Sequence, residues 1–226
     1  MNHYTQSQGR RRDLRVLADL EVCGLLSQDQ IHLLNFANVS TEMSHRCTQR
    51  LVEKKQIRRV NMRWAGEPDW FYPYDTKRPD QVQHRLGKAW IYTGLQVRTS
   101  ATPTQELIYF KSEEMQFLPT VKPDIYAVIR HGGENGYLFG EFQVTESGNR
   151  WDKDYPTLFR TFAEDVPITL QVVTTGSYEP IKKILTKQMT EFKNVHIEYM
   201  MLSKLRELCW RVALRQKGLT NNAKSS

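Results

Sequence analysis

The 226-residue chain has only three cysteines and no long apolar run. Cys23, Cys47 and Cys209 are far apart in sequence, and no Cys-x-x-Cys pair suggests a zinc site. We expect reduced core cysteines, which are typical of a cytoplasmic protein rather than a secreted one. No segment has the length and hydropathy of a membrane-spanning helix, and the polar stretch 1–9 is unlike a signal peptide. The sequence therefore predicts a cytoplasmic protein that does not interact with a membrane.

Positive charge exceeds negative charge, with 32 Lys and Arg against 25 Asp and Glu and a formal net charge of +7. This balance favours an anionic partner. The apolar content of 39% is ordinary for a globular protein, and the length exceeds that of one typical domain. We expect two domains, over 10–75 and 80–217, joined by a short linker. A disordered tail is expected over 218–226.

The first domain has the sequence signals of helices followed by a hairpin. Leu14, Leu17 and Ala18 recur at three- and four-residue spacing, which predicts the buried side of a first helix. Ser27 and Gln30 have the spacing of a capping box, in which each side chain satisfies a backbone donor at the start of a second helix. The elements expected next are a turn at 38–41, a basic helix over 42–55, and strands over 56–62 and 70–74 joined by a turn at 65–68.

This order of elements predicts a winged helix-turn-helix whose basic helix has two faces. Met43, Cys47 and Leu51 recur at four-residue spacing and should pack inward. Arg and Gln side chains on the other face can make bidentate contacts to guanine and adenine edges, so we predict double-stranded DNA as the partner. A protein-docking module is the alternative. The expected DNA-binding residues are Arg11 and Arg12 of a basic arm before the first helix, His45, Arg46, Gln49, Arg50 and Lys54 of the basic helix, and Arg58, Arg59 and Arg63 of the wing.

The second domain is expected to be an α/β sandwich around a mixed sheet, because a helix and antiparallel strands are followed by alternating helices and strands. A strongly apolar strand lies in its middle. The expected elements are a helix over 81–96, strands over 107–110, 125–130 and 137–144, a helix over 155–163, a strand over 168–174, a helix over 178–193, a strand over 195–200 and a helix over 203–215.

A possible metal-dependent nuclease site lies on two of these strands. Asp124 begins one strand, and Glu141 and Gln143 share one face of the next because they are two residues apart. In the restriction-endonuclease-like fold, an aspartate and a Glu-x-Lys pair at these places hold Mg²⁺ or Mn²⁺ and orient the attacking water. Gln143 stands at the lysine position and cannot carry a positive charge. Lys153 is the candidate substitute for the missing lysine.

The chain resembles the replication-relaxation family of plasmid and mobile-element proteins. The resemblance implies a restriction-endonuclease-like fold in the second domain, commonly with an acid or amide where a nuclease needs lysine. It also implies a role in plasmid replication or mobilisation. The matching motifs, whose order along the chain is the specific part, lie at 26–31, 49–51, 83–86, 121–124, 139–143 and 153–155.

The leading hypothesis is a non-enzymatic DNA-binding accessory protein of replication or mobilisation that needs no cofactor. Its nuclease-like domain would be inactive and would serve self-association, as a homodimer, or docking of a replication or relaxase partner. The first alternative is a metal-dependent DNA endonuclease that binds Mg²⁺ or Mn²⁺ through Asp124 and Glu141. The second is a winged-helix transcriptional regulator.

Overall fold

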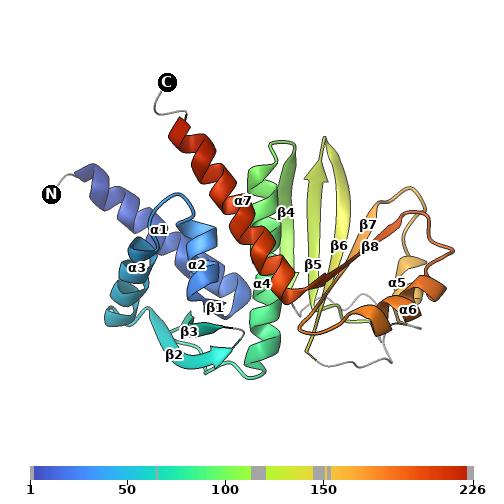
Figure 1. Ribbon diagram of the computed structural model, residues 1–226, viewed down its shortest axis with the longest axis horizontal. Helices are drawn as coiled ribbons and strands as arrows, with labels where there is room; N and C mark the ends of the chain where they lie inside the picture. Colours follow the sequence, from blue (N-terminus) through green and yellow to red (C-terminus); the bar gives the residue numbers. More distant parts are fainter. Residues whose placement is uncertain (1–2, 65, 113–120, 145–150, 152–153, 223–226) are drawn as a thin grey trace. The chain divides into compact units, whose positions relative to one another are not determined.

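The chain folds as an α/β protein with seven helices and eight strands in its described part (Figure 1). It forms two compact units: unit 1 contains the residues up to 89 together with those from 209, and unit 2 contains 90–208. Both dividing points fall inside helices, α4 (Val82–Ala101) and α7 (Leu202–Asn222), rather than in the expected linker. The computed structural model describes residues 3–64, 66–112, 121–144, 151 and 154–222.

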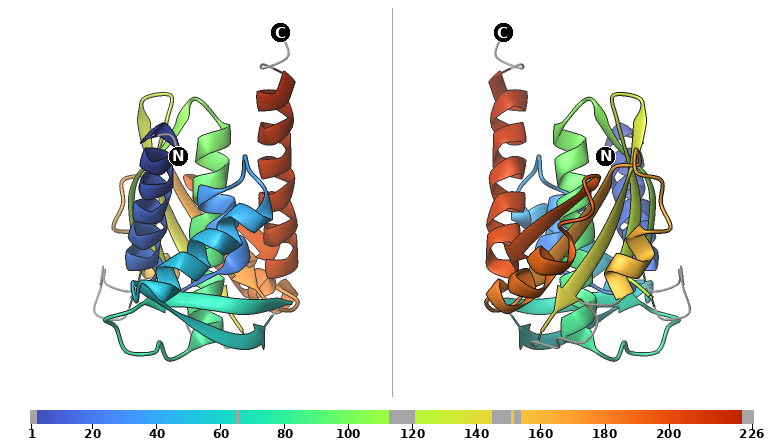
Figure 2. Two further views of the ribbon diagram at one scale, coloured as in Figure 1. Left: turned by 90° about the vertical axis from the view of Figure 1, so that its left-hand side faces the viewer. Right: turned by 90° about the vertical axis from the view of Figure 1, so that its right-hand side faces the viewer.

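Unit 1 combines helices with a small antiparallel sheet of order β1-β3-β2 (Figures 1 and 2). The central strand pairs with both neighbours, Phe71 with Leu26 on one side and with Arg59 on the other. Trp70 is fully buried among Leu25 and Leu86. The elements of unit 1 before α4 are α1 (His3–Cys23), β1 (Leu26–Ser27), α2 (Gln28–Asn35), α3 (Thr41–Glu53), β2 (Ile57–Trp64) and β3 (Glu67–Pro73).

The start of α2 confirms the expected capping box. The Ser27 hydroxyl accepts a hydrogen bond from the Gln30 backbone N–H at 3.2 Å, and the Gln30 side chain accepts one from the Ser27 N–H at 2.7 Å. The Gln30 amide also donates to the Leu86 carbonyl at 3.1 Å. The cap therefore connects α2 to the first turns of α4 within the same unit.

Two expectations about α1 are wrong. Leu14 is 59% exposed and Ala18 is also exposed, whereas Val16 and Leu20 are completely buried. The buried side of α1 therefore differs from the predicted one, because Val16 and Leu20 pack in the same core cluster as Leu26 and Phe71. In addition, α1 begins at His3, so Arg11 and Arg12 lie within a helix and do not form an arm before it.

Unit 2 is a five-stranded mixed sheet of order β4-β5-β6-β7-β8, antiparallel from β4 to β6 and parallel from β6 to β8. The mixed sheet confirms the expected α/β class. The β5–β6 turn is shorter than expected, and Gly132 and Gly133 adopt the positive φ that it requires. The elements of unit 2 between α4 and α7 are β4 (Gln105–Ser112), β5 (Ile125–His131), β6 (Glu134–Gln143), α5 (Asp154–Phe159), β7 (Ile168–Thr174), α6 (Glu179–Gln188) and β8 (Val195–Met201).

Helices cover both faces of this sheet (Figure 1). On one face, α4 packs over β6, so that a Cβ on Gly140 would lie 3.4 Å from the Ile91 side chain of α4 and 3.1 Å from the Cβ of Ile125 on the neighbouring strand β5. On the other face, α5 and α6 bury Phe139 and Val172 in an aromatic core. A side chain at position 140 therefore requires Ile125 to shift by a few tenths of an ångström, whereas glycine fits without a shift.

The C-terminal helix is longer than expected. Helix α7 continues to Asn222, so 218–222 is helical and not a disordered tail, and residues 223–226 lie outside the described part. All three cysteines are free thiols, as expected, with Cys47 and Cys209 buried. None of the described helices is long and apolar enough to cross a membrane.

Candidate nucleic-acid interface

The outward face of α3 carries three of the residues expected to contact DNA. His45, Arg46 and Gln49 are exposed there. Arg46 forms an ion pair with Glu42, one turn earlier, and both side chains are more than two-thirds exposed. Gln49 donates to Glu53 at 3.0 Å. Because such exposed pairs contribute only about 0.2–1 kcal/mol, an anionic partner can compete for these donors.

The inward face of α3 differs from the expected one. Met43 is 44% exposed, and the buried positions are Ser44, Cys47, Thr48 and Leu51. These follow the i, i+3, i+4, i+7 spacing that keeps side chains on one side of a helix, whereas a strict four-residue spacing drifts around it. The sequence signal was hidden because two of the four buried residues are polar.

A buried hydrogen-bond network explains these polar residues. The Gln28 amide donates to the Ser44 hydroxyl at 3.1 Å, and the Thr48 hydroxyl donates to the Gln28 carbonyl oxygen at 2.9 Å. The Ser44 hydroxyl itself donates to the Thr41 carbonyl at 2.7 Å. Since every one of these groups has a partner, α2 and α3 are held together by directional bonds as well as by apolar contact.

His32 completes the network and joins it to α7. Its Nδ1 lies 3.3 Å from the Ser44 oxygen, and because the Ser44 proton is used on Thr41, this nitrogen is the donor. The imidazole stacks on Trp210, with ring centroids 5.4 Å apart. Burial lowers the pKa of His32, as do Lys217 and His45, while Asp29 acts in the opposite direction. The neutral imidazole is therefore the form that fits this site.

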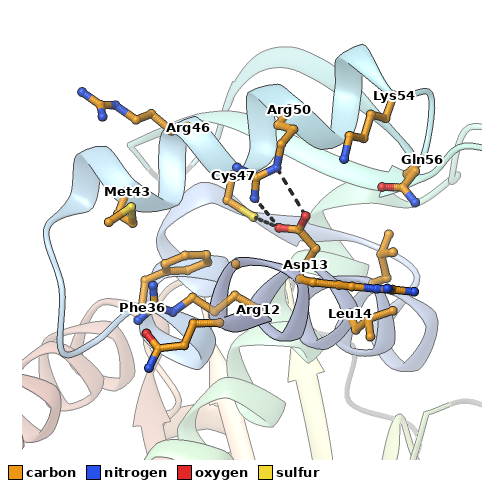
Figure 3. Close-up of a pocket in the computed structure, with 14 residues that line it drawn as sticks. Arg12, Asp13, Leu14, Phe36, Met43, Arg46, Cys47, Arg50, Lys54 and Gln56 are labelled. Atoms are coloured by element: carbon orange, nitrogen blue, oxygen red, sulfur yellow. Dashed lines mark hydrogen bonds and ion pairs between the residues drawn. The ribbon is translucent and has the colours of Figure 1, made fainter. Parts of the chain in front are cut away.

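Arg50 does not take the expected outward position. Its guanidinium binds the Asp13 carboxylate of α1 through two hydrogen bonds, of 2.5 and 3.3 Å (Figure 3). The Cys47 thiol donates to the same carboxylate at 3.1 Å. Burial, followed by this hydrogen bond, raises the pKa of Cys47 to about 12. Asp13 thus connects α1 to two residues of α3, and Arg50 faces α1.

The arginines expected to lie on a wing are also partly engaged within the protein. Arg59 holds Asp69 of β3 through two hydrogen bonds, of 2.9 and 2.7 Å. The Arg58 guanidinium lies 4.6 Å from the centre of the Tyr74 ring. Arg63 is exposed near the end of β2, and Lys54 is exposed at the C-terminal end of α3. The β2–β3 hairpin therefore carries exposed arginines on its surface. Among them, Arg59 chiefly stabilises the pairing of β2 with β3.

In unit 2 the structure brings Asp124 and Glu141 together. An Asp124 carboxylate oxygen accepts the Phe142 backbone N–H at 2.9 Å, and a Glu141 oxygen faces the Asp124 N–H at 3.4 Å. The Tyr155 hydroxyl of α5 donates to the same Glu141 oxygen. Both side chains are buried, so their carboxylates act as acceptors inside the protein.

Of the other two residues expected in a nuclease site, only one lies in the described part of the chain. Gln143 is half-buried on the same strand, and Lys153 lies outside the described residues. Within the described part of the chain, no group of three His, Cys, Asp or Glu side chains could hold a metal ion. Asp124 and Glu141 are thus a pair of carboxylates without a third His, Cys, Asp or Glu ligand among the described residues.

Unit 2 contains a second polar cluster that the sequence did not predict. This cluster lies on the face of the sheet that does not carry Glu141. There the Gln171 amide donates to Glu198 at 3.2 Å, and Arg98 of α4 lies 3.4 Å from the same carboxylate. These residues are distant in sequence, and only the pairing of β7 with β8 reveals their proximity.

No family model matches this chain, and comparison with curated proteins found no relative of significant similarity.

Proposed function

We propose that the protein binds double-stranded DNA through unit 1, as a winged helix-turn-helix. The order helix, strand, helix, helix, strand, strand, with β3 at the centre of its sheet, supports this fold assignment. In such a domain α3 is the recognition helix and the β2–β3 hairpin is the wing. The helix would read base edges, and the wing would contact the backbone.

The observation that carries the proposal is the outward face of α3, where His45, Arg46 and Gln49 are exposed together. An arginine and an amide side chain on one helix face can make the bidentate contacts that identify guanine and adenine. Lys54 and Arg58 extend the positive charge from the end of α3 to the hairpin. This combination supplies both base readout and phosphate contact.

We further propose that unit 2 is a nuclease-like fold without nuclease activity, which serves self-association or docks a replication or relaxase partner. The engagement of Asp124 and Glu141 with protein donors supports a structural role for both carboxylates. The accessory role in plasmid replication or mobilisation rests on the resemblance described above, and it predicts that the preferred DNA sequence lies near a replication or transfer origin.

Selection from a random duplex pool, followed by affinity measurements at several salt concentrations, tests DNA binding. Replacing Arg46 or Gln49 with Ala should cost roughly 1–3 kcal/mol for the selected sequence, because base contacts are lost. Arg58→Ala should weaken binding to all sequences alike and reduce the salt dependence. Arg160→Ala, at an exposed site in unit 2, is the control. Unchanged affinity in both α3 variants would exclude α3 as the recognition helix.

A metal-dependent endonuclease is the second candidate, favoured by the proximity of Asp124 to Glu141. Supercoiled plasmid incubated with Mg²⁺ or Mn²⁺ tests it. We expect no nicking, and we expect Asp124→Ala and Glu141→Ala to leave DNA affinity unchanged while lowering the stability of unit 2. The expected loss is about 1–3 kcal/mol, since buried N–H and O–H donors lose their acceptors. Nicking that disappears in both variants would establish the nuclease instead.

A further inference from the structure

An open groove runs between α1 and α3 in unit 1 (Figure 3). Its volume is about 750 Å³, which lies within the usual range of about 300–1,000 Å³ for ligand sites. The two helices that form its walls are joined at its base by the Asp13–Arg50 ion pair. This pair holds the walls at a defined separation.

The groove exposes apolar side chains that folding leaves uncovered. Leu14 of α1 is 59% exposed and Met43 of α3 is 44% exposed, and both line the groove. Leu17 and Phe36 also line it, and Phe36 is almost completely buried. Two large apolar side chains facing one groove from opposite helices form a surface that a partner can cover with a gain of hydrophobic free energy.

The charged residues around this apolar surface are mostly of one sign. Asp13 is the one carboxylate among the described lining residues, and Arg50 neutralises it. The surrounding cations leave a positive rim on both walls. The cations that line the groove besides Arg50 are Arg10 and Arg12 of α1, Arg46 in the middle of α3 and Lys54 at its C-terminal end.

We propose that this groove binds an acidic, amphipathic helix of a partner protein. A trough between two neighbouring helices accepts the apolar stripe of a third helix, and glutamates beside that stripe would meet the positive rim. Duplex DNA fits less well, because its phosphates would leave Leu14 and Met43 in water. Arg46 and Lys54 belong both to this rim and to the proposed DNA-binding face. The apolar part of the groove is separate from that face, since Met43 lies on the flank of α3 that faces α1, away from His45 and Gln49.

Three labelled helical peptides of about 16 residues test this proposal with the full chain. One has leucines at i, i+3, i+4 and i+7 with glutamates elsewhere, the second has lysines in place of glutamates, and the third has the acidic composition with its leucines scrambled. Fluorescence anisotropy should show that the acidic amphipathic peptide binds at least about tenfold more tightly than the other two. Equal binding of the scrambled acidic peptide would overturn the proposal, because it would indicate a general polyanion surface.

Neutral variants locate the bound peptide. The double variant Leu14→Gln, Met43→Gln should weaken the acidic amphipathic peptide by about tenfold or more, because the apolar contact is lost without a change in charge. Val22→Gln is the matched control, since Val22 is an exposed apolar residue of α1 that does not line the groove. An equal loss in the control variant would contradict the assignment to the groove.

Two further measurements distinguish the proposed helix from duplex DNA and from a second copy of the chain as the occupant of the groove. The groove variants should retain wild-type affinity for duplex DNA, and a loss of DNA affinity equal to that of Arg46→Ala would reassign the groove to DNA. Sedimentation equilibrium should give the same mass for the wild type and the double variant. A dimer that dissociates in Leu14→Gln, Met43→Gln would reassign the groove to a second copy of the chain and overturn the proposal.

Discussion

Arg46 and Arg50 lie one turn apart on α3, yet they meet different carboxylates. Arg46 pairs with Glu42 of its own helix in water, whereas Arg50 reaches Asp13, 37 residues earlier, at a site where the Asp13 side chain is only 15% exposed. Charge patterning along a helix detects the first kind of pair but not the second. The position of Arg50 could therefore not be predicted from the sequence, although the exposure of Arg46 and Gln49 could.

The Asp13 site should matter for stability. Asp13→Asn removes the charge that holds Arg50 and Cys47, and it should lower the free energy of unfolding by about 1–2 kcal/mol. Urea denaturation followed by circular dichroism measures this change. Glu42→Gln removes a pair that is about two-thirds exposed, at a similar distance, and should cost less than about 0.5 kcal/mol. Equal losses would mean that the Asp13 contact has no special stabilising role.

Protonation of His32 should destabilise unit 1. Burial lowers the folded-state pKa of His32 below 6.5, so as the pH falls the unfolded chain takes up the proton before the folded chain does. The stabilisation is thus complete above pH 6.5 and is lost as the pH falls through the folded-state pKa. His32→Asn, which retains a donor to Ser44, should flatten the stability profile below pH 6.5. A profile unchanged by the substitution would contradict this expectation.

At the scale of elements, the order and type of the helices and strands in the described residues could largely be predicted. The strand over 168–174 has the expected ends, because an apolar run bounded by turn residues is an unambiguous signal. The inward face of α3 could not be predicted, since Ser44 and Thr48 become core residues only through Gln28. The length of α1 was missed because its first turns have no apolar stripe and 3–12 is polar.

The two caps of unit 1 provide a matched comparison. Ser27 caps α2 with a side-chain hydrogen bond, whereas Ser40 precedes α3 without one. Ser27→Ala should therefore lower the free energy of unfolding by about 0.5–2 kcal/mol, and Ser40→Ala should have little effect. Thermal and urea unfolding of the two variants measure the difference. Similar losses at both positions would show that the capping box does not carry the stabilisation.

At the scale of the whole molecule, unit 1 needs residues that a division at the linker would separate from it. The unit 1 cores include Leu86 and Ala89 of α4, and the His32 ring needs Trp210 of α7. The linker at 75–80 was inferred from local composition, which carries no information about where a later helix packs. The expected homodimer stays a prediction, and light scattering with and without DNA would measure it.

Two N-terminal fragments test whether α4 belongs to the core of unit 1. A fragment ending at residue 80 lacks Leu86 and Ala89, so it leaves Trp70 and Tyr72 without their α4 neighbours. We expect it to show poor chemical-shift dispersion and non-cooperative unfolding. A fragment ending at residue 101 keeps the whole of α4 and should unfold more cooperatively. If the shorter fragment were as stable as the longer one, α4 would not belong to the core of unit 1.

The participation of α7 in unit 1 also affects how the chain folds during its synthesis. The ribosome releases α1 to α3 early, but Trp210, the stacking partner of His32, is added only about 160 residues after the end of α3, an interval on the order of ten seconds at about 5–20 residues per second. Throughout that interval the polar network around Ser44 lacks Trp210 of α7, which stacks on His32 in the folded protein. The α2–α3 pair therefore reaches its final environment only after α7 has been synthesised, which would delay the proposed binding of DNA by a nascent chain.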